Sequence, residues 1–385
     1  MKYKLLGRSG LRVSELCLGA GTFGTNWGPL GSSKEESHKI FDAFANAGGN
    51  YLDTSNRYQE GMSEEIVGEC IASERDKYIV GSKYSLYDTF AMMNDPNASG
   101  NHRKNMVRSV ESSLKRLGTD YIDILWIHMW DFTTPIEEVM RALDDLVRSG
   151  KILYIGASNV PSWICSQANT IADFRGWTPL NALQVEYNLV ERSAERDFLP
   201  MASALDMTVT SWSALSGGMV TGKYNDSASL DPNETHRLQD ALDPSKGHVW
   251  NAGLQRNLAI MEKVVEVSKE IGRPTVQVAL NFLRHQGVIP IFSARTLAQA
   301  EEDIACLDWN LTAEEFAKVQ AATEAALSTP IVANGYPYDF LDYGSPAIPG
   351  FNVRQMMFGF VGKNIEFEAH RPIPYPGGTE PRPVP

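Results

Sequence analysis

The sequence has few of the features that mark secreted, membrane-bound or metal-binding proteins. Its 385 residues include only four cysteines, which are far apart and form no Cys-x-x-Cys or Cys/His ligand spacing. They predict reduced thiols rather than disulfides or a metal site. The N-terminus lacks the apolar segment of a signal peptide, and no apolar run approaches the roughly 18 residues that a membrane helix requires. We therefore expect a cytoplasmic protein with no membrane segment.

Positive charge is also scarce. The chain has 35 Lys and Arg residues against 47 Asp and Glu, which gives a net charge of −12. A protein this acidic is poorly suited to bind nucleic acid or anionic membranes. The expected partners are small molecules, and association into a homo-oligomer stays open.

A glycine-rich dinucleotide fingerprint is missing after the first strand-like run, which argues against a Rossmann fold. Instead, short apolar runs alternate with segments of helical periodicity, a pattern typical of α/β folds. Most of these runs show little alternation of apolar and polar residues, as expected of parallel strands buried on both faces. Eight such runs, preceded by a β-hairpin over residues 1–14, favour a (β/α)8 TIM barrel. The predicted strands cover residues 15–19, 50–54, 78–83, 122–128, 152–157, 182–186, 208–212 and 288–292.

Two capping boxes predict where helices begin. Residues 134–137 (TPIE) combine a capping box with a proline at the first helical position, and Gly150 would end that helix. Residues 312–315 form the second box and open a helix that reaches about residue 327. Further helices are predicted over residues 63–72, 105–117, 261–271 and 275–283.

Two stretches interrupt the alternation of strands and helices. Residues 213–255 predict a long loop after the seventh strand. Residues 331–385 hold nine of the twenty prolines together with many aromatic residues, which predicts an extended, largely non-helical arm. We therefore expect one barrel domain over residues 1–330 and a C-terminal extension over residues 331–385.

Four ionisable residues follow three consecutive predicted strands. Asp53 ends the second strand, with Tyr58 in the loop behind it, Lys83 ends the third strand and His128 ends the fourth. The active sites of (β/α)8 barrels lie at the carboxyl ends of their strands, so these side chains should converge. Each of them alone could serve as a cap, a packing residue or a surface charge, but their coincidence at adjacent strand ends favours catalysis.

The chemistry of these four residues is that of a proton donor. A phenol has a pKa near 10, and a neighbouring ammonium such as Lys83 would lower it. Asp53 can hold and balance Lys83, while His128 can hydrogen-bond a substrate oxygen. The set suits carbonyl reduction but contains no reductant, so a hydride donor is implied.

The sequence resembles the aldo-keto reductase superfamily from about residue 7 to residue 325, and within it the members similar to aryl-alcohol dehydrogenases and potassium-channel β-subunits. The resemblance implies a (β/α)8 barrel, reduction of an aldehyde or ketone to an alcohol, and Asp53, Tyr58, Lys83 and His128 as the catalytic residues. It rests on several motifs: LGAGTFG (18–24), YLDTSNRY (51–58), GSK (81–83), IHMWD (127–131), GASN (156–159), QVEYNLVER (184–192), WSALSGGMVTGKY (212–224) and SARTLAQAEED (293–303).

The resemblance also implies NADP(H) as cofactor, with Arg295 pairing with the 2′-phosphate. Where related proteins have a glycine before the Ala-Arg pair, this chain has Ser293, and no lysine stands at residues 290–294, so use of NAD(H) stays open. The cofactor residues implied by the motifs are Gly21, Thr22, Phe23, Asp53, Ser158, Asn159, Gln184, Trp212, Ser213, Leu215, Gly217, Lys223, Ser293, Arg295, Gln299, Glu302 and Asp303.

For the substrate, aromatic residues near the strand ends suggest an aryl carbonyl, although sugars also stack on aromatic rings. The predicted substrate-binding residues are Phe23, Trp27, Tyr58, Tyr84, His128 and Trp130, together with residues of the C-terminal extension.

Two other functions are compatible with parts of the pattern. Channel-β-subunit-like members bind NADPH on the same barrel and act mainly through a partner, but they commonly carry another residue where this chain has His128. A cofactor-free aldolase could use Lys83 as a Schiff base, but it would leave Tyr58 and the 293–303 motif unexplained.

Overall fold

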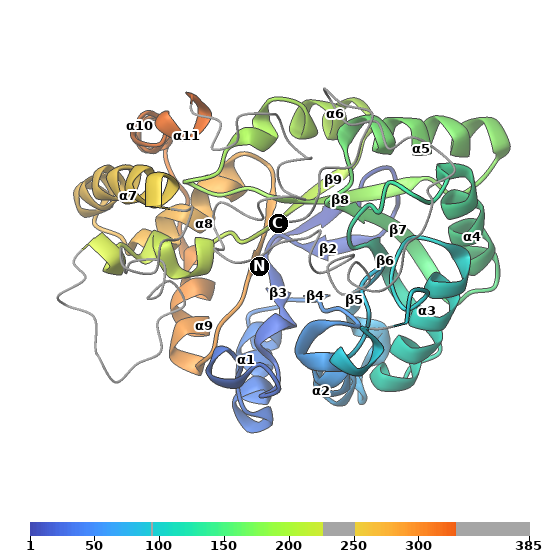
Figure 1. The fold of residues 1–385 in the computed structure, drawn as a ribbon. Coiled ribbons are helices and arrows are strands. Elements are labelled where there is room, and N and C mark those ends of the chain that lie inside the picture. Colours follow the sequence, from blue (N-terminus) through green and yellow to red (C-terminus); the bar gives the residue numbers. More distant parts are fainter. Residues whose placement is uncertain (94, 226–250, 329–385) are drawn as a thin grey trace.

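The computed structural model describes residues 1–93, 95–225 and 251–328. Eight parallel strands close into a barrel in the order β10-β3-β4-β5-β6-β7-β8-β9, and helices form a ring around it (Figure 1). This confirms the predicted (β/α)8 barrel, with strand boundaries within two residues of those predicted. The barrel strands are β3 (Cys17–Gly19), β4 (Tyr51–Asp53), β5 (Ile79–Tyr84), β6 (Ile122–Ile127), β7 (Ile152–Ser158), β8 (Leu180–Glu186), β9 (Thr208–Trp212) and β10 (Ile289–Phe292).

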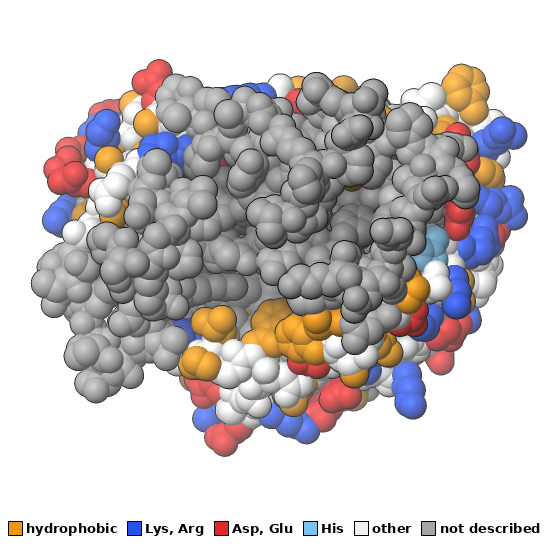
Figure 2. Space-filling view, in the orientation of Figure 1, with side chains coloured by type: hydrophobic (Ala, Val, Ile, Leu, Met, Phe, Trp, Pro, Cys, Tyr) orange, Lys and Arg blue, Asp and Glu red, His pale blue; other side chains and the backbone are white. Residues whose placement is uncertain are grey.

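The helices bury their apolar faces against the outer surface of the barrel. In α4 the buried apolar positions recur every three or four residues, for example Ile136, Val139, Met140 and Leu143. Charged side chains of both signs lie on the visible outer faces (Figure 2). The helices are α1 (Lys34–Asn46), α2 (Met62–Ile71), α3 (Arg103–Leu117), α4 (Ile136–Arg148), α5 (Ser162–Arg175), α6 (Phe198–Ala204), α7 (Asn251–Ile271), α8 (Thr275–His285), α9 (Leu297–Ile304), α10 (Ala313–Ala322) and α11 (Ala325–Ser328).

The N-terminal hairpin closes one end of the barrel. Strands β1 (Tyr3–Leu5) and β2 (Arg12–Ser14) pair antiparallel, as predicted. The fully buried Leu6 and Val13 of the hairpin pack with Tyr51, Ile79 and other residues at the starts of barrel strands. Because the hairpin fills the amino ends of the strands, only the carboxyl ends are left for a site.

Trp126 of β6 is a large side chain that is fully buried in the barrel interior. Gly156 lies opposite it on β7, and Gly81 lies on β5 two residues before Lys83, which is its partner there. A Cβ atom at Gly81 would lie 2.7 Å from Trp126, and one at Gly156 would lie 2.3 Å from it. These two glycines therefore create the space that the indole occupies.

One of the two predicted capping boxes is wrong. At the start of α4 the N-cap residue is Pro135 and no side chain caps the helix. The hydroxyl of Thr134 instead donates to Asp131 Oδ2. The other oxygen of the same carboxylate accepts the backbone N–H groups of Thr133 and Thr134. The box formed by Thr312 and Glu315 is confirmed at the start of α10.

The predicted loop over residues 213–255 is partly wrong. Its beginning folds into short 3₁₀ helices, η7 (Ser216–Thr221) and η8 (Lys223–Asn225), and α7 already begins at Asn251. Residues 226–250 and the predicted arm from residue 329 onward lie outside the described residues, so the division at residue 330 stays a prediction. Within the described residues, no helix combines the length and apolar character needed to cross a membrane.

Candidate active site

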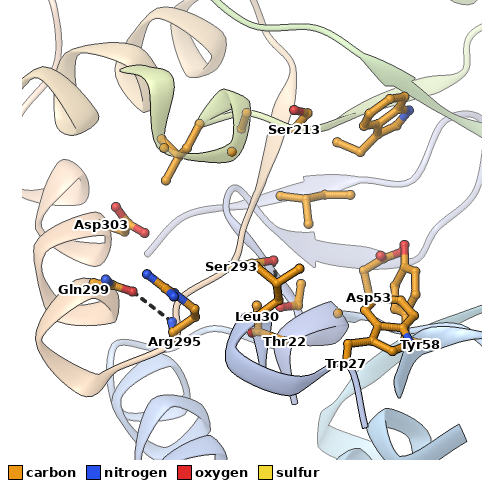
Figure 3. A pocket seen from close by; sticks show the side chains of 18 of the residues that line it. Thr22, Trp27, Leu30, Asp53, Tyr58, Ser213, Ser293, Arg295, Gln299 and Asp303 are labelled. Carbon is orange, nitrogen blue, oxygen red and sulfur yellow. Dashed lines mark hydrogen bonds between the residues drawn. The ribbon is translucent and has the colours of Figure 1, made fainter. Parts of the chain in front are cut away.

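A cavity of about 410 Å³ lies at the carboxyl ends of the barrel strands. Asp53, Tyr58 and Trp27 lie close together at one end of it, and Arg295, Gln299 and Asp303 lie at the other (Figure 3). The cavity thus joins a cluster of proton-transfer groups to a distant cation.

Lys83 and Asp53 form a buried ion pair under one end of the cavity. Lys83 Nζ lies 2.5 Å from Asp53 Oδ2 and donates to the backbone oxygen of Thr54 at 2.8 Å. The other carboxylate oxygen accepts a hydrogen bond from Gln184 Nε2 at 2.9 Å. Burial alone would lower the pKa of Lys83, but the charges of Asp53 and Tyr58 outweigh it and raise that pKa above its usual value. Lys83 and Asp53 therefore form an ion pair next to the cavity.

Tyr58 lies between this cation and the cavity. Its ring centroid is 4.6 Å from Lys83 Nζ, and its ring meets those of His128 and Trp27 edge-on, at 5.9 and 6.1 Å between centroids. A Cβ atom on Gly21 would lie only 3.6 Å from the Tyr58 ring, so the glycine keeps the space beside the phenol open. The phenol can exchange a proton with a bound molecule while it remains next to Lys83.

His128 is a neutral imidazole in the wall of the cavity. Burial, together with the nearby Lys83 cation, holds the pKa of His128 well below its usual range. Its Nδ1 lies 3.4 Å from Ser55 Oγ. A neutral imidazole carries one ring proton, and in the tautomer with that proton on Nε2 the ring can donate to a substrate oxygen.

Polar groups at the ends of β7, β8 and β9 continue the wall next to Asp53. Trp212 Nε1 donates to Asn159 Oδ1 at 3.2 Å, and Asn159 Nδ2 donates to the backbone oxygen of His128 at 3.0 Å. Ser158 and Gln184 line the cavity beside them. An indole face next to two amides suits a planar ring that carries a carboxamide.

The loop after β9 has the backbone geometry of an anion site. Ser213, Ser216, Gly217 and Gly218 all have positive φ, between 49° and 91°. The hydroxyls of Ser213 and Ser216 are buried and have no hydrogen-bond partner among the described residues. Such left-handed turns form concave backbone surfaces that bind phosphate, and the hydroxyl of Ser213, which lines the cavity, would be satisfied by a phosphate oxygen. The residues therefore fit the pyrophosphate of a dinucleotide.

At the far end of the cavity, Arg295 supplies the cation. Its backbone N–H donates to Gln299 Oε1 at 2.9 Å, and its Nη1 donates to the backbone oxygen of Pro29 at 3.2 Å (Figure 3). Ser293 Oγ donates to the backbone oxygen of Gly19 at 2.9 Å. The serine hydroxyl is thus engaged with the barrel, and the Arg295 guanidinium supplies the positive charge that a second phosphate would need at this end.

Comparison with known proteins agrees with this geometry. The profile of the aldo/keto reductase family matches residues 15–324. The chain is 35% identical over 376 residues to an aryl-alcohol dehydrogenase [NADP(+)] of Phanerodontia chrysosporium, which covers 94% of this chain and 93% of the relative. It is 33% identical over 341 residues to norsolorinic acid reductase A of Aspergillus parasiticus, with 86% and 82% covered.

The chain belongs to the aldo/keto reductase family. The predicted resemblance is thereby confirmed, and this aldo/keto reductase is an oxidoreductase of a family that reduces carbonyl groups.

Most of the predicted site residues meet in this one cavity of the aldo/keto reductase. Lys83 lies behind Asp53 and Tyr58 rather than in the lining. The lining includes the predicted residues Gly21, Thr22, Trp27, Asp53, Tyr58, His128, Ser158, Asn159, Gln184, Trp212, Ser213, Leu215, Gly217, Lys223, Ser293, Arg295, Gln299, Glu302 and Asp303.

Three predicted aromatic residues do not reach the cavity. Phe23, Tyr84 and Trp130 are buried in the hydrophobic core on the outer side of the barrel. The Tyr84 hydroxyl donates to the backbone oxygen of Asn101 at 3.4 Å. Tyr84 belongs to β5, where successive side chains point to opposite faces, so it points away from the interior that Lys83 enters.

Several lining residues were not predicted from the sequence. Leu30 and Leu86 supply apolar surface to the lining, and Arg57 supplies a second cation next to Tyr58 in the chain. Arg57 directly precedes Tyr58 in the same polar loop, which was the signal that could have identified it. The two leucines carry no comparable signal, because apolar residues in loops usually only pack.

Proposed function

We propose that this aldo/keto reductase reduces an aryl aldehyde or ketone to the alcohol with NADPH, and that Tyr58 donates the proton. The observation that carries the proposal is the position of Tyr58 in the cavity wall, 4.6 Å from a Lys83 ammonium that is held by Asp53. The names of the two relatives, one an NADP(+) dehydrogenase of aryl alcohols, support the cofactor and the aryl class.

The residues divide the reaction between them. NADPH, when bound, supplies the hydride to the carbonyl carbon. Tyr58 delivers its hydroxyl proton to the carbonyl oxygen as negative charge develops there, and Lys83 stabilises the phenolate that remains. Neutral His128 donates a hydrogen bond to the same oxygen and fixes its approach.

The cofactor is held along the length of the cavity. Asn159 and Gln184 would bind the carboxamide and Trp212 would stack on the nicotinamide, which sets the ring face that the substrate meets. The loop containing Ser213 and Ser216 would hold the pyrophosphate, and Arg295 would pair with the 2′-phosphate by charge-assisted hydrogen bonds. Trp27, Leu30 and Leu86 leave apolar surface for an aromatic substrate.

The test is the oxidation of NADPH by the full chain in stopped flow, with 4-nitrobenzaldehyde as substrate. We expect loss of absorbance of the reduced nicotinamide and formation of 4-nitrobenzyl alcohol in equal amounts. Tight binding of NADPH without turnover of this or other aryl aldehydes would contradict the enzyme and favour a regulatory subunit that acts through a partner.

Two observations weigh against the other functions. His128 lines the cavity beside Tyr58, in a position from which it could contact a bound substrate. A Schiff-base lysine must lose its proton. Burial alone would lower the pKa of Lys83, but the neighbouring negative charges outweigh it and raise that pKa, which disfavours the aldolase.

Because the four cysteines are free thiols, we also propose that the enzyme works in the cytoplasm.

A further inference from the structure

Arg57 is a buried cation in the wall of the active-site cavity. Only 5% of its surface is exposed, although arginine is among the residues least often buried. Its guanidinium carbon lies 4.2 Å from the ring centroid of Phe90, 4.7 Å from that of Tyr87 and 5.9 Å from that of Trp27. Aromatic faces attract the cation and hold its plane in position, but they accept few of its hydrogen bonds.

Among the described residues, one nitrogen of this guanidinium has no hydrogen-bond partner. Arg57 Nη1 is buried and makes no hydrogen bond to any of the described residues. A buried donor without an acceptor is costly, and more so when it carries charge. Such a group is expected where a ligand supplies the acceptor.

The carboxylates near Arg57 have other partners. Asp53 accepts from Lys83 and Gln184, and Asp88 accepts from Asn56 Nδ2 at 2.6 Å and from Arg116 Nη1 at 3.3 Å. Glu60 Oε2 accepts from the backbone N–H of Phe90 at 3.3 Å. Among the described residues, none of these carboxylates therefore accepts a hydrogen bond from Arg57 Nη1.

Arg57 and the proton donor share a neighbour. The Trp27 ring lies 6.1 Å from the Tyr58 ring, which it meets edge-on, and 5.9 Å from the Arg57 guanidinium carbon. Tyr58, Trp27 and Arg57 all line the cavity, and its lining also includes the apolar Leu30 and Leu86. A molecule whose carbonyl faces Tyr58 could thus rest an aromatic ring on this apolar wall and extend a polar group to Arg57.

We propose that Arg57 is a specificity residue that binds a carboxylate on the substrate, so that the preferred substrates are aryl aldehydes or ketones that carry an acid group. This inference rests on the proposed reduction and names its substrate class. A carboxylate oxygen would satisfy Nη1 with a charge-assisted hydrogen bond, whereas an uncharged group would leave the buried cation unbalanced.

The first test compares 4-carboxybenzaldehyde with its uncharged methyl ester, methyl 4-formylbenzoate. For the full chain with NADPH, we expect a higher kcat/KM for the acid. In Arg57→Met the ratio of kcat/KM between acid and ester should fall by roughly tenfold or more, mostly through the KM of the acid, because a charge-assisted hydrogen bond is lost. Arg57→Lys should restore part of the ratio, since it keeps the charge but not the planar donor group.

The control for lost positive charge is Arg8→Met. Arg8 pairs with the exposed Asp173 on the outer surface, so its removal lowers the net charge equally but should leave the ratio as in the wild type. Reduction of both aldehydes with no preference for the acid, or an equal loss for acid and ester in Arg57→Met, would overturn the role of Arg57 while leaving the proposed reaction intact.

The second test does not depend on turnover. Calorimetric titration of the chain saturated with NADP⁺ should show benzoate binding more tightly than benzamide, and Arg57→Met should abolish the difference. If neither aldehyde were reduced but benzoate binding still required Arg57, the proposed reaction would be wrong and the anion site would stand. Equal affinities for benzoate and benzamide in the wild type would refute the anion site.

Discussion

At the scale of single residues, the environment of Lys83 explains why an ammonium can be buried beside a tyrosine. Asp53 supplies the countercharge at 2.5 Å, and the backbone oxygen of Thr54 accepts a second hydrogen bond. A buried charge is tolerated when it is paired and hydrogen-bonded in this way. The pair thus keeps a positive charge next to Tyr58.

Replacing Tyr58 by phenylalanine tests the proton donor. We expect kcat for 4-nitrobenzaldehyde to fall by about 10²–10⁴-fold, because the general acid is removed, while the Kd for NADPH measured by fluorescence stays within a few fold. The matched control is Tyr84→Phe, which removes a hydroxyl that points into the core and binds Asn101. Comparable kcat values in Tyr58→Phe and wild type would remove Tyr58 from its role.

The neutral state of His128 has a consequence for stability. Since burial and Lys83 lower its pKa in the folded protein, the unfolded chain binds a proton near pH 6.5 that the folded chain does not. As the pH falls from 7.5 to 5.5, this residue should lower the unfolding free energy by at most about 1.4 kcal/mol. Urea unfolding should show a correspondingly smaller pH dependence in His128→Gln, and identical losses in both proteins would contradict a neutral His128.

At the scale of elements, the contacts between neighbouring strands decide whether the barrel can close. Trp126 occupies the interior only because Gly81 on β5 and Gly156 on β7 have no side chains. The sequence pattern predicted these strands but not this packing, because strand patterns report burial and not which side chains meet. The failed capping box at residues 134–137 has a local origin instead: the Asp131 carboxylate, three residues earlier, accepts the Thr134 hydroxyl.

Gly156→Ala tests this packing. The new methyl group would lie 2.3 Å from the Trp126 ring, so we expect a loss of about 1–3 kcal/mol in unfolding free energy by urea denaturation. Gly10→Ala is the matched control, since a Cβ atom there has no neighbour within 4 Å. A variant at position 156 as stable as the control would show that the indole can move aside at little cost.

At the scale of the whole molecule, the proposed cofactor would connect parts of the barrel that are distant in sequence. The loop after β9 carries Ser213 and Ser216, while Arg295 follows β10. A ligand that binds the folded chain alone stabilises it according to its concentration and affinity. Cofactor binding should therefore be visible as increased stability of the entire barrel.

At about one hundred times its Kd, NADP⁺ should raise the unfolding free energy by about 2.7 kcal/mol, measurable as a rise in Tm. In Arg295→Ala the same NADP⁺ concentration should raise Tm much less, because the partner of the 2′-phosphate is lost. The smaller stabilisation by NAD⁺ should hardly change and serves as the control. Equal losses for both nucleotides would contradict the assignment of Arg295 to the phosphate.

The sequence by itself determined the barrel and the identity of its polar strand ends. The alternation of buried strands with helices and the order of the motifs are local properties, and the closure of eight parallel strands then brings Asp53, Lys83 and His128 to one rim. Only the tertiary structure decided which side chains face the cavity. It turned Tyr84 and Trp130 into the core and placed Arg57 in the cavity wall, with one nitrogen that has no partner among the described residues. Such orientations depend on strand twist and on packing between segments far apart in the chain.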